Sequence, residues 1–132
     1  MSFHRKTVRA ATRLRGFHAE QAVTDHLMRL GHTILYRNYH VGHLELDIVA
    51  RDGSTIIVVE VRYRGPSAWT SPLESIDASK QRRLLRATEI LWDTHFVDDP
   101  TVTTIRIDVA CVETSEHGTD IRVIENAITH PC

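Results

Sequence analysis

The sequence predicts an α/β sandwich in which helices cover a small, mixed central sheet of five strands. Apolar residues recur at helical spacing in residues 8–30 and again in residues 84–92. Alternating and continuous apolar runs in residues 33–64 indicate strands between these helices, and two further strand-like runs follow residue 100. The predicted order is therefore helix, three strands, helix and two strands.

The bulk composition is that of one soluble domain. The 132 residues contain no repeat or linker, so we treat residues 1–132 as a single unit. No apolar run reaches membrane-spanning length, the N-terminal stretch lacks the hydrophobic region of a signal peptide, and two cysteines give no disulfide framework. We expect a cytoplasmic protein without a membrane partner.

The net charge of −1 argues against a protein that coats nucleic acid by bulk electrostatics. Basic residues nevertheless concentrate in residues 4–15 and in the segment Lys80 to Arg86, which includes Arg83. Either stretch suits contacts with phosphates, and a solvated helix face explains either stretch about equally well. Composition therefore permits a nucleic-acid partner without requiring one.

The elements follow from local signals. The first helix is expected to end at Gly31, and strands follow in "TILYRNY" and "HLELDIVA". Asp52-Gly53 is a strong hairpin signal that joins the second strand to the third, "STIIVVEVRYR". The second helix begins either at a capping box from Ser71 or at Asp77, and "VDDP" ends it. The last strands are expected in "TVTTIRIDVACVE" and "DIRVIENAI".

A two-residue turn at Asp52-Gly53 fixes which residues of the hairpin lie opposite each other. The predicted pairs are Arg51–Ser54, Asp47–Val58, Glu45–Glu60 and His43–Arg62. Opposed residues, and residues two apart on one strand, share a face of the sheet. Four charged side chains are therefore expected on one face, with His43 beside them: Glu45, Asp47, Glu60 and Arg62. A three-residue turn would reverse this arrangement.

Carboxylates that converge on a covered sheet face repel one another, and they persist together by sharing a proton or by binding a hard cation. Mg²⁺ suits such a set because it accepts a few carboxylates, keeps several waters and contacts substrate phosphates. The alternative is that Glu60 pairs with Arg62 or Arg64 and caps one end of the sheet. Spacing alone favours neither interpretation.

Five segments, in this order and spacing, resemble the bacterial YraN family of small uncharacterised proteins: "LRGFHAEQAVTDHLMRLGHTILYRNY", "LELDIVARDG", "IIVVEVRYR", "PLESIDASKQRRLLRATEIL" and "IRIDVACV". The resemblance covers residues 14–128. It implies a restriction-endonuclease-like fold of the PD-(D/E)XK type, similar to archaeal Holliday junction resolvases. Related resolvases act as dimers, so the resemblance also makes a homodimer one expected assembly.

By this resemblance, Glu20 on the first helix, Asp47 and Glu60 are the acidic ligands of a nuclease-like site that takes Mg²⁺ or Mn²⁺. Glu45 matches the family's acidic residue before Asp47 and is expected to support the site. Further positions match the family: Arg64, Lys80, Gln81, Arg106 and Asp108. Of these, Arg64 and Lys80 are expected to bind nucleic acid and Gln81 to support the site.

The sequence departs from the family at Arg62, which stands where the Glu-x-Lys motif has its lysine. Arginine stays protonated and recognises phosphate in a bidentate fork, so Arg62 is suited to stabilise charge and unsuited to act as a base. Lys80 is a second source of an ammonium group, from the neighbouring helix.

Three functions are therefore considered. The first is Mg²⁺-dependent hydrolysis of phosphodiesters in branched or single-stranded DNA, in which Asp47, Glu60 and Arg62 carry the chemistry. The second is a catalytically silent module that binds nucleic acid and uses Arg62 as a phosphate grip. The third is an interaction protein without a nucleic-acid partner. Trp69 is a candidate for stacking on an unpaired base.

Overall fold

A mixed sheet of five strands forms the centre of the part of the chain that the computed structural model describes, residues 18–64 and 75–130. The strands lie side by side in chain order: β1 (Thr33–Val41), β2 (Leu44–Asp52), β3 (Thr55–Arg64), β4 (Thr104–Ser115) and β5 (Gly118–Ile124). β3 and β4 are parallel, and the other neighbours are antiparallel. This sheet and its element order confirm the predicted α/β sandwich with a mixed central sheet of five strands.

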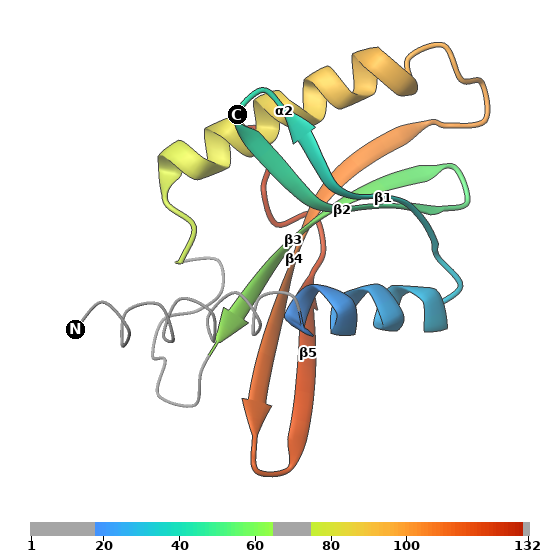
Figure 1. Cartoon of the computed structure of the whole chain (residues 1–132). Coiled ribbons are helices and arrows are strands. Elements are labelled where there is room, and N and C mark those ends of the chain that lie inside the picture. The colour runs from blue at the N-terminus through green and yellow to red at the C-terminus, as the bar shows by residue number, and fades with distance from the viewer. Residues whose placement is uncertain (1–17, 65–74, 131–132) are drawn as a thin grey trace.

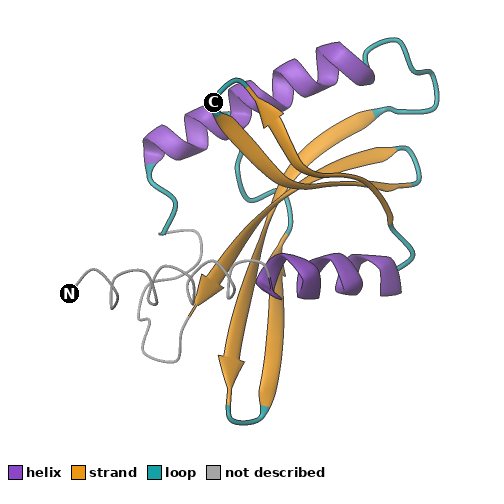
Figure 2. Cartoon of the chain, in the orientation of Figure 1, coloured by secondary structure: helices purple, strands orange, loops and turns teal. Residues whose placement is uncertain are grey.

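Helices lie on both faces of the sheet (Figure 1, Figure 2). The first helix, described over residues 18–29, packs on one face, and α2 (Ala78–His95) packs on the other. α2 also lies in the crossover connection that parallel pairing of β3 with β4 requires. Within the described residues, no helix combines the length and the apolar character needed to cross a bilayer.

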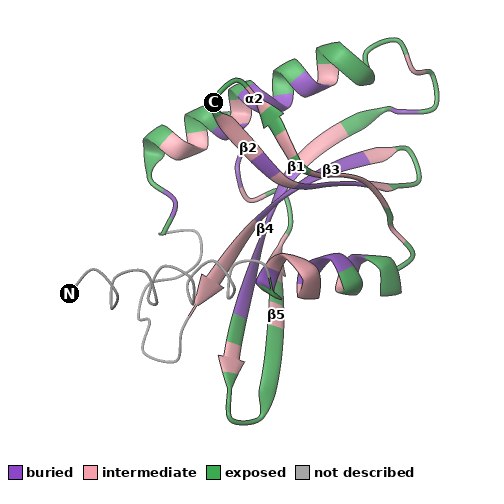
Figure 3. Cartoon of the chain, in the orientation of Figure 1, coloured by how far each residue is buried: buried purple, intermediate pink, exposed green. Residues whose placement is uncertain are grey.

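β3 is covered from both sides, as its continuous apolar run predicts. Ile56 and Val58 pack toward α2, whereas Ile57 and Val59 pack toward the first helix. None of the four is more than 1% exposed, and Figure 3 shows the centre of the sheet buried. Burying each such side chain contributes about 1.5–3 kcal/mol. Glu60 follows directly, so this strand carries its carboxylate to the edge of a fully packed core.

β1 and β2 share an irregularity at Asn38 and Asp47. These two residues meet between the register pairs Arg37–Ile48 and Tyr39–Leu46. Leu46 packs toward α2, whereas Ile48 packs toward the first helix, although residues two apart on a regular strand share a face. Asn38 has a φ of 52°, in the left-handed region that Asn enters more readily than most residues. At Asn38 and Asp47 the alternation of side chains between the two faces of the sheet is therefore interrupted in both strands. We call this interruption the phase change.

The β2–β3 hairpin differs from the predicted register by two residues. Its turn is Gly53-Ser54 rather than Asp52-Gly53, because Gly53 adopts a φ of 60° as the first turn residue and Asp52 stays in the strand, opposite Thr55. The predicted pair Asp47–Val58 is therefore wrong, and Val58 lies opposite Val49. A shift of two residues leaves the alternation of side chains along β3 unchanged.

α2 begins after Asp77, one of the two predicted starts; the other, at Ser71, lies outside the described residues. Asp77 Oδ1 accepts a hydrogen bond from the backbone N–H of Lys80 at 2.7 Å. This cap satisfies one of the free N–H groups at the end of the helix and fixes the turn that carries Lys80.

Replacing Asp77 with Ala is expected to lower the free energy of unfolding by about 1 kcal/mol, because the cap is lost. Asp77→Asn is the matched control, since Asn caps a helix as well as Asp does. Urea unfolding monitored by circular dichroism measures both variants. Equal stability of Asp77→Ala and the parent protein would contradict the role of the cap.

Candidate functional site

Asp47 lies where β2 and β3 separate. The register pairs of this hairpin run from Asp52–Thr55 to Ile48–Val59. Beyond the pair Ile48–Val59, the Asp47 side chain provides the acceptor in place of the main chain of β2. Its Oδ2 accepts a hydrogen bond from the backbone N–H of Val61 at 2.8 Å. Burial raises the pKa of Asp47, and the Val61 N–H opposes this rise. Asp47 thus binds β3 through its carboxylate at the point where β2 and β3 separate, after Ile48 and Val59, which we call the fork.

Glu60 is a buried carboxylate, only 4% exposed, on the face of the sheet that packs toward α2. Its Oε1 lies 3.6 Å from Arg62 Nη2 and 3.6 Å from Lys80 Nζ. Its Oε2 is buried and has no hydrogen-bond partner among the described residues. Burial, with a contribution from the charge of Asp47, raises the pKa of Glu60 to about 7, although Lys80 and Arg62 oppose the rise.

A second group of carboxylates contains Glu20, Glu45 and Asp47, each of which offers an oxygen within 4.8 Å of the others. With its amide nitrogen turned toward them, Asn38 donates to Glu20 Oε2 at 3.1 Å and to Glu45 Oε1 at 2.6 Å. Burial and then the charge of Asp47 raise the pKa of Glu20, and Arg37, 4.0 Å away, opposes them. Asp47 therefore belongs to this group, and its charge also acts on Glu60.

The structure corrects the prediction that four charged residues share one face. Glu60 and Arg62 alternate with Val58 on the face toward α2, as predicted, but Glu45 lies beside Glu20 of the first helix. The phase change at Asn38 and Asp47 is the physical reason, because it turns Glu45 to the opposite side of the sheet. The acidic residues therefore reach the fork from both faces rather than from one.

Two cations reach Glu60. Arg62 comes from the same strand, and its Nε is buried without a hydrogen-bond partner among the described residues. Lys80 comes from the first turn of α2, which Asp77 caps. An ammonium group thus lies next to the motif glutamate even though the motif lysine is replaced by Arg62. The sequence names Lys80 as a candidate, and the fold brings it to the acidic group.

Several predicted site residues lie elsewhere. Arg64 Nη1 pairs with Glu113 Oε1 at 3.6 Å, and the Gln81 side chain donates to the Ile76 carbonyl at 3.0 Å, at the start of α2. His43 is not opposite Arg62, as the predicted register had it, because β2 begins only at Leu44 and His43 is part of the exposed β1–β2 turn. Arg83 is exposed on α2.

Two further positions that match the family form a separate ion pair on β4. Arg106 Nε donates to Asp108 Oδ1 at 3.0 Å, and the same oxygen accepts from the backbone N–H of Asn126 at 2.9 Å. This pair fixes the segment that follows β5. Trp69 and the basic residues 4–15 lie outside the described residues.

Sequence reasoning missed Arg37 and Asn38, which contact the acidic residues from β1. Arg37 Nη1 also donates to Gln21 Oε1 at 2.9 Å and so connects β1 to the first helix. The available signal was weak: two polar residues interrupt the apolar alternation of "TILYRNY" at the point where an Asn with positive φ breaks the strand.

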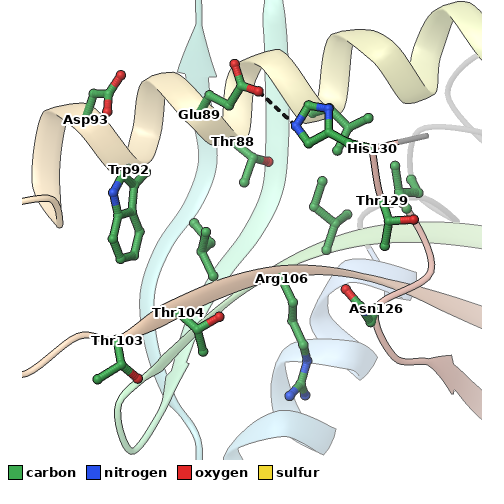
Figure 4. A pocket seen from close by; sticks show the side chains of 14 residues that line it. Thr88, Glu89, Trp92, Asp93, Thr103, Thr104, Arg106, Asn126, Thr129 and His130 are labelled. Carbon is green, nitrogen blue, oxygen red and sulfur yellow. Dashed lines mark ion pairs between the residues drawn. The ribbon is translucent and has the colours of Figure 1, made fainter. Parts of the chain in front are cut away.

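A cavity of about 600 Å³ lies between α2, β4 and the segment after β5, away from the acidic residues. Figure 4 shows Trp92 and Thr88 of α2 directed toward β4 across this space. At its rim, His130 Nε2 and Glu89 Oε1 form an ion pair at 2.8 Å. None of the predicted catalytic or metal-binding residues lines this cavity, so the chemistry predicted from the sequence belongs at the fork instead.

Comparison with known proteins places the chain in a family. Residues 19–112 match the model of the uncharacterised protein family UPF0102. The chain belongs to UPF0102, and the predicted YraN membership is thereby confirmed. A UPF0102 protein of Sorangium cellulosum is 46% identical over 102 residues, which cover 77% of this chain and 71% of the relative. One of Pseudomonas paraeruginosa is 38% identical over 125 residues, which cover 92% and 97%.

Among solved structures, this UPF0102 chain is similar to the structure of Pyrococcus furiosus SfsA in complex with Ca²⁺. The similarity has a TM-score of 0.42 and a sequence identity of 15%, and it covers 86% of this chain and 62% of that one.

The raised pKa of Glu60 in this UPF0102 protein predicts a pH-dependent stability. Between the ordinary value of 4.5 and about 7, the folded chain keeps a proton that the unfolded chain has lost. The stability contributed by this group is therefore lost as the pH rises through that window. Glu60→Gln, which cannot ionise, is expected to exceed the parent protein in stability by about 3 kcal/mol more at pH 8 than at pH 4.

Urea unfolding at pH 4, 6 and 8 measures this difference. Glu116→Gln, at an exposed position in the β4–β5 turn, is the matched control and should track the parent protein throughout. A difference between Glu60→Gln and the parent protein that does not change with pH would show that folding does not raise the pKa of Glu60.

Proposed function

We propose that this protein binds nucleic acid and hydrolyses phosphodiester bonds with the help of Mg²⁺ or Mn²⁺. The observation that carries the proposal is the state of Glu60: a buried carboxylate with one oxygen that has no partner among the described residues, near the half-buried carboxylate of Asp47 and two cations. A buried polar atom without a partner costs about 1–3 kcal/mol, so a purely structural role does not account for Glu60 Oε2.

The acidic residues fit a hard divalent cation. Mg²⁺ prefers a small number of carboxylate oxygens and keeps waters in its remaining positions. Glu20, Glu45 and Asp47, whose oxygens lie within 4.8 Å of one another, would hold the ion. Glu60, the third ligand predicted from the sequence, lies outside this cluster but close enough to Asp47 for their charges to interact, and it would join the ligands from the other face of the sheet. When bound, such an ion would offset the repulsion among the carboxylates and stabilise the charge that develops on a phosphodiester.

The residues of the chain supply the rest. Arg62 offers a guanidinium fork that matches two phosphate oxygens and keeps its charge at every relevant pH. Lys80 offers a smaller ammonium group, 3.6 Å from the same carboxylate. In this proposal Lys80 takes over the task of the missing motif lysine, and Arg62 orients and holds the scissile phosphate.

One observation favours a second candidate, a catalytically silent module that binds nucleic acid. Arg62 and Lys80 both pair with Glu60 Oε1, so the two cations are able to neutralise Glu60 without a metal ion. Such a site would still bind phosphate through its cations. Cleavage therefore separates the two candidates, whereas binding does not.

Cleavage of fluorescently labelled single-stranded, flap and four-way-junction DNA with Mg²⁺ or Mn²⁺ tests the proposal. We expect metal-dependent cutting of at least one of these substrates and loss of cutting in Asp47→Asn. The control is Asp98→Asn, an exposed position in the turn after α2. Binding without cutting by the parent protein at any metal concentration would favour the silent module.

Lys80→Ala is expected to slow cleavage by about 100-fold or more, as removal of a group that stabilises transition-state charge does elsewhere. Arg62→Lys should change the rate less than about tenfold, because an ammonium from Lys80 is already present. Single-turnover kinetics measure both variants. If Arg62→Lys instead confers cutting on a protein that otherwise only binds, the silent module describes the natural sequence.

A further inference from the structure

A groove of about 300 Å³ lies between the β1–β2 turn and the outer side of α2. The turn contributes residues 41–44, including His43, and α2 contributes Arg83, Arg86, Ala87 and Ile90. His43, Arg83 and Arg86 are exposed, whereas Ala87 is buried. Ile90 is 41% exposed and is one of the four large apolar side chains that are exposed among the described residues. The groove thus combines cationic rims with apolar walls.

The groove arginines, Arg83 and Arg86, follow Lys80 along α2, and Lys80 contacts the acidic site. Residues three apart on a helix are neighbours, so Lys80, Arg83 and Arg86 form a stripe that winds around α2, with Arg86 about 120° around the helix from Lys80. Lys80 contacts Glu60, and Arg86 lies about 9 Å farther along the helix axis at 1.5 Å per residue. Among the described residues, neither Arg83 nor Arg86 forms an ion pair with a carboxylate, so both guanidinium groups are available to an anionic ligand.

We propose that this groove binds a single-stranded segment of nucleic acid, within about three nucleotides of the phosphate at the acidic site. One strand of a duplex advances about 3.4 Å per nucleotide along its axis, and an unstacked strand advances farther, so the distance of about 9 Å along α2 from Lys80 to Arg86 spans about three nucleotides at most. The inference rests on the proposed function for the identity of the polymer, and it adds the strand state of the substrate and the direction in which it leaves the site.

The apolar walls are the reason for choosing a single strand over a duplex. A duplex presents phosphates and hides the faces of its bases, so Arg83 and Arg86 alone would serve it equally well. An unpaired base has an exposed face that packs on apolar side chains and on rings such as that of His43. The same groove that holds the two arginines is lined by the apolar side chains of Val41, Leu44 and Ile90.

Fluorescence anisotropy with a labelled single-stranded oligonucleotide in EDTA tests the groove without cleavage. In Arg83→Ala/Arg86→Ala we expect affinity to fall at least tenfold and the slope of log K against log salt to decrease by about 1–2, as two lost phosphate contacts require. The control is Arg29→Ala/Arg122→Ala, which removes the same charge at exposed positions outside the groove.

A second pair of variants tests the preference for single strands. Ile90→Ser is expected to weaken binding of the single strand several-fold and to leave binding of a duplex of equal length unchanged. Val97→Ser, at a position that is 52% exposed and outside the groove, should change neither. Equal losses for single strand and duplex in Ile90→Ser would overturn the assignment of a base to the apolar walls.

The outcomes separate the groove from the proposed function. If the protein binds and cuts DNA but Arg83→Ala/Arg86→Ala behaves like its control, the groove inference is wrong and the hydrolysis stands. If the groove variants lose binding and no metal ion elicits cutting, the groove inference stands and the hydrolysis is wrong. If the parent protein binds no nucleic acid at low salt, both are wrong.

Discussion

The hydrogen bond from the Val61 amide to the Asp47 carboxylate is the contact on which the rest of the site depends. Two antiparallel strands normally continue to pair through their main chains, and here the ladder gives way to a side chain after Ile48 and Val59. The strands separate at that point because a carboxylate, longer than a carbonyl group, now stands between them. The fork brings Asp47 within reach of acidic residues from both faces of the sheet.

The fork also creates an electrostatic problem that the fold only partly solves. Four carboxylates converge, from Glu20, Glu45, Asp47 and Glu60, while Arg37, Arg62 and Lys80 bring three positive charges. Burial weakens the screening that would make this tolerable in water. The consequence is visible in the raised pKa values of Glu20, Asp47 and Glu60. A proton or a divalent cation would relieve the imbalance.

Much of the fold was predictable because its signals are local. The apolar run of β3, the N-cap at Asp77 and the order of the elements all follow from short stretches of sequence. Even the turn predicted one residue too early did little harm to the face of Glu60 and Arg62, since the resulting register error was two residues and alternation has a period of two. The face of Glu45 was mispredicted because the phase change at Asn38 and Asp47 requires two strands to break together. Alternation read along one strand does not reveal that event.

The position of Lys80 illustrates why the site needs the tertiary structure. No spacing rule connects a residue at the start of α2 with Glu60 on β3, because the intervening loop sets where the helix begins. Asp77 fixes the first turn of α2, and this turn places Lys80 at Glu60. The following turn places Arg83 and Arg86 at the groove beside the β1–β2 turn. Under the proposed function, the replacement of the motif lysine by Arg62 has a structural explanation. Lys80 on a helix and Arg62 on a strand both approach Glu60, so a bound phosphate would contact an ammonium group from α2 and a guanidinium group from β3. A lysine at position 62 would offer the phosphate a second ammonium group and no bidentate contact.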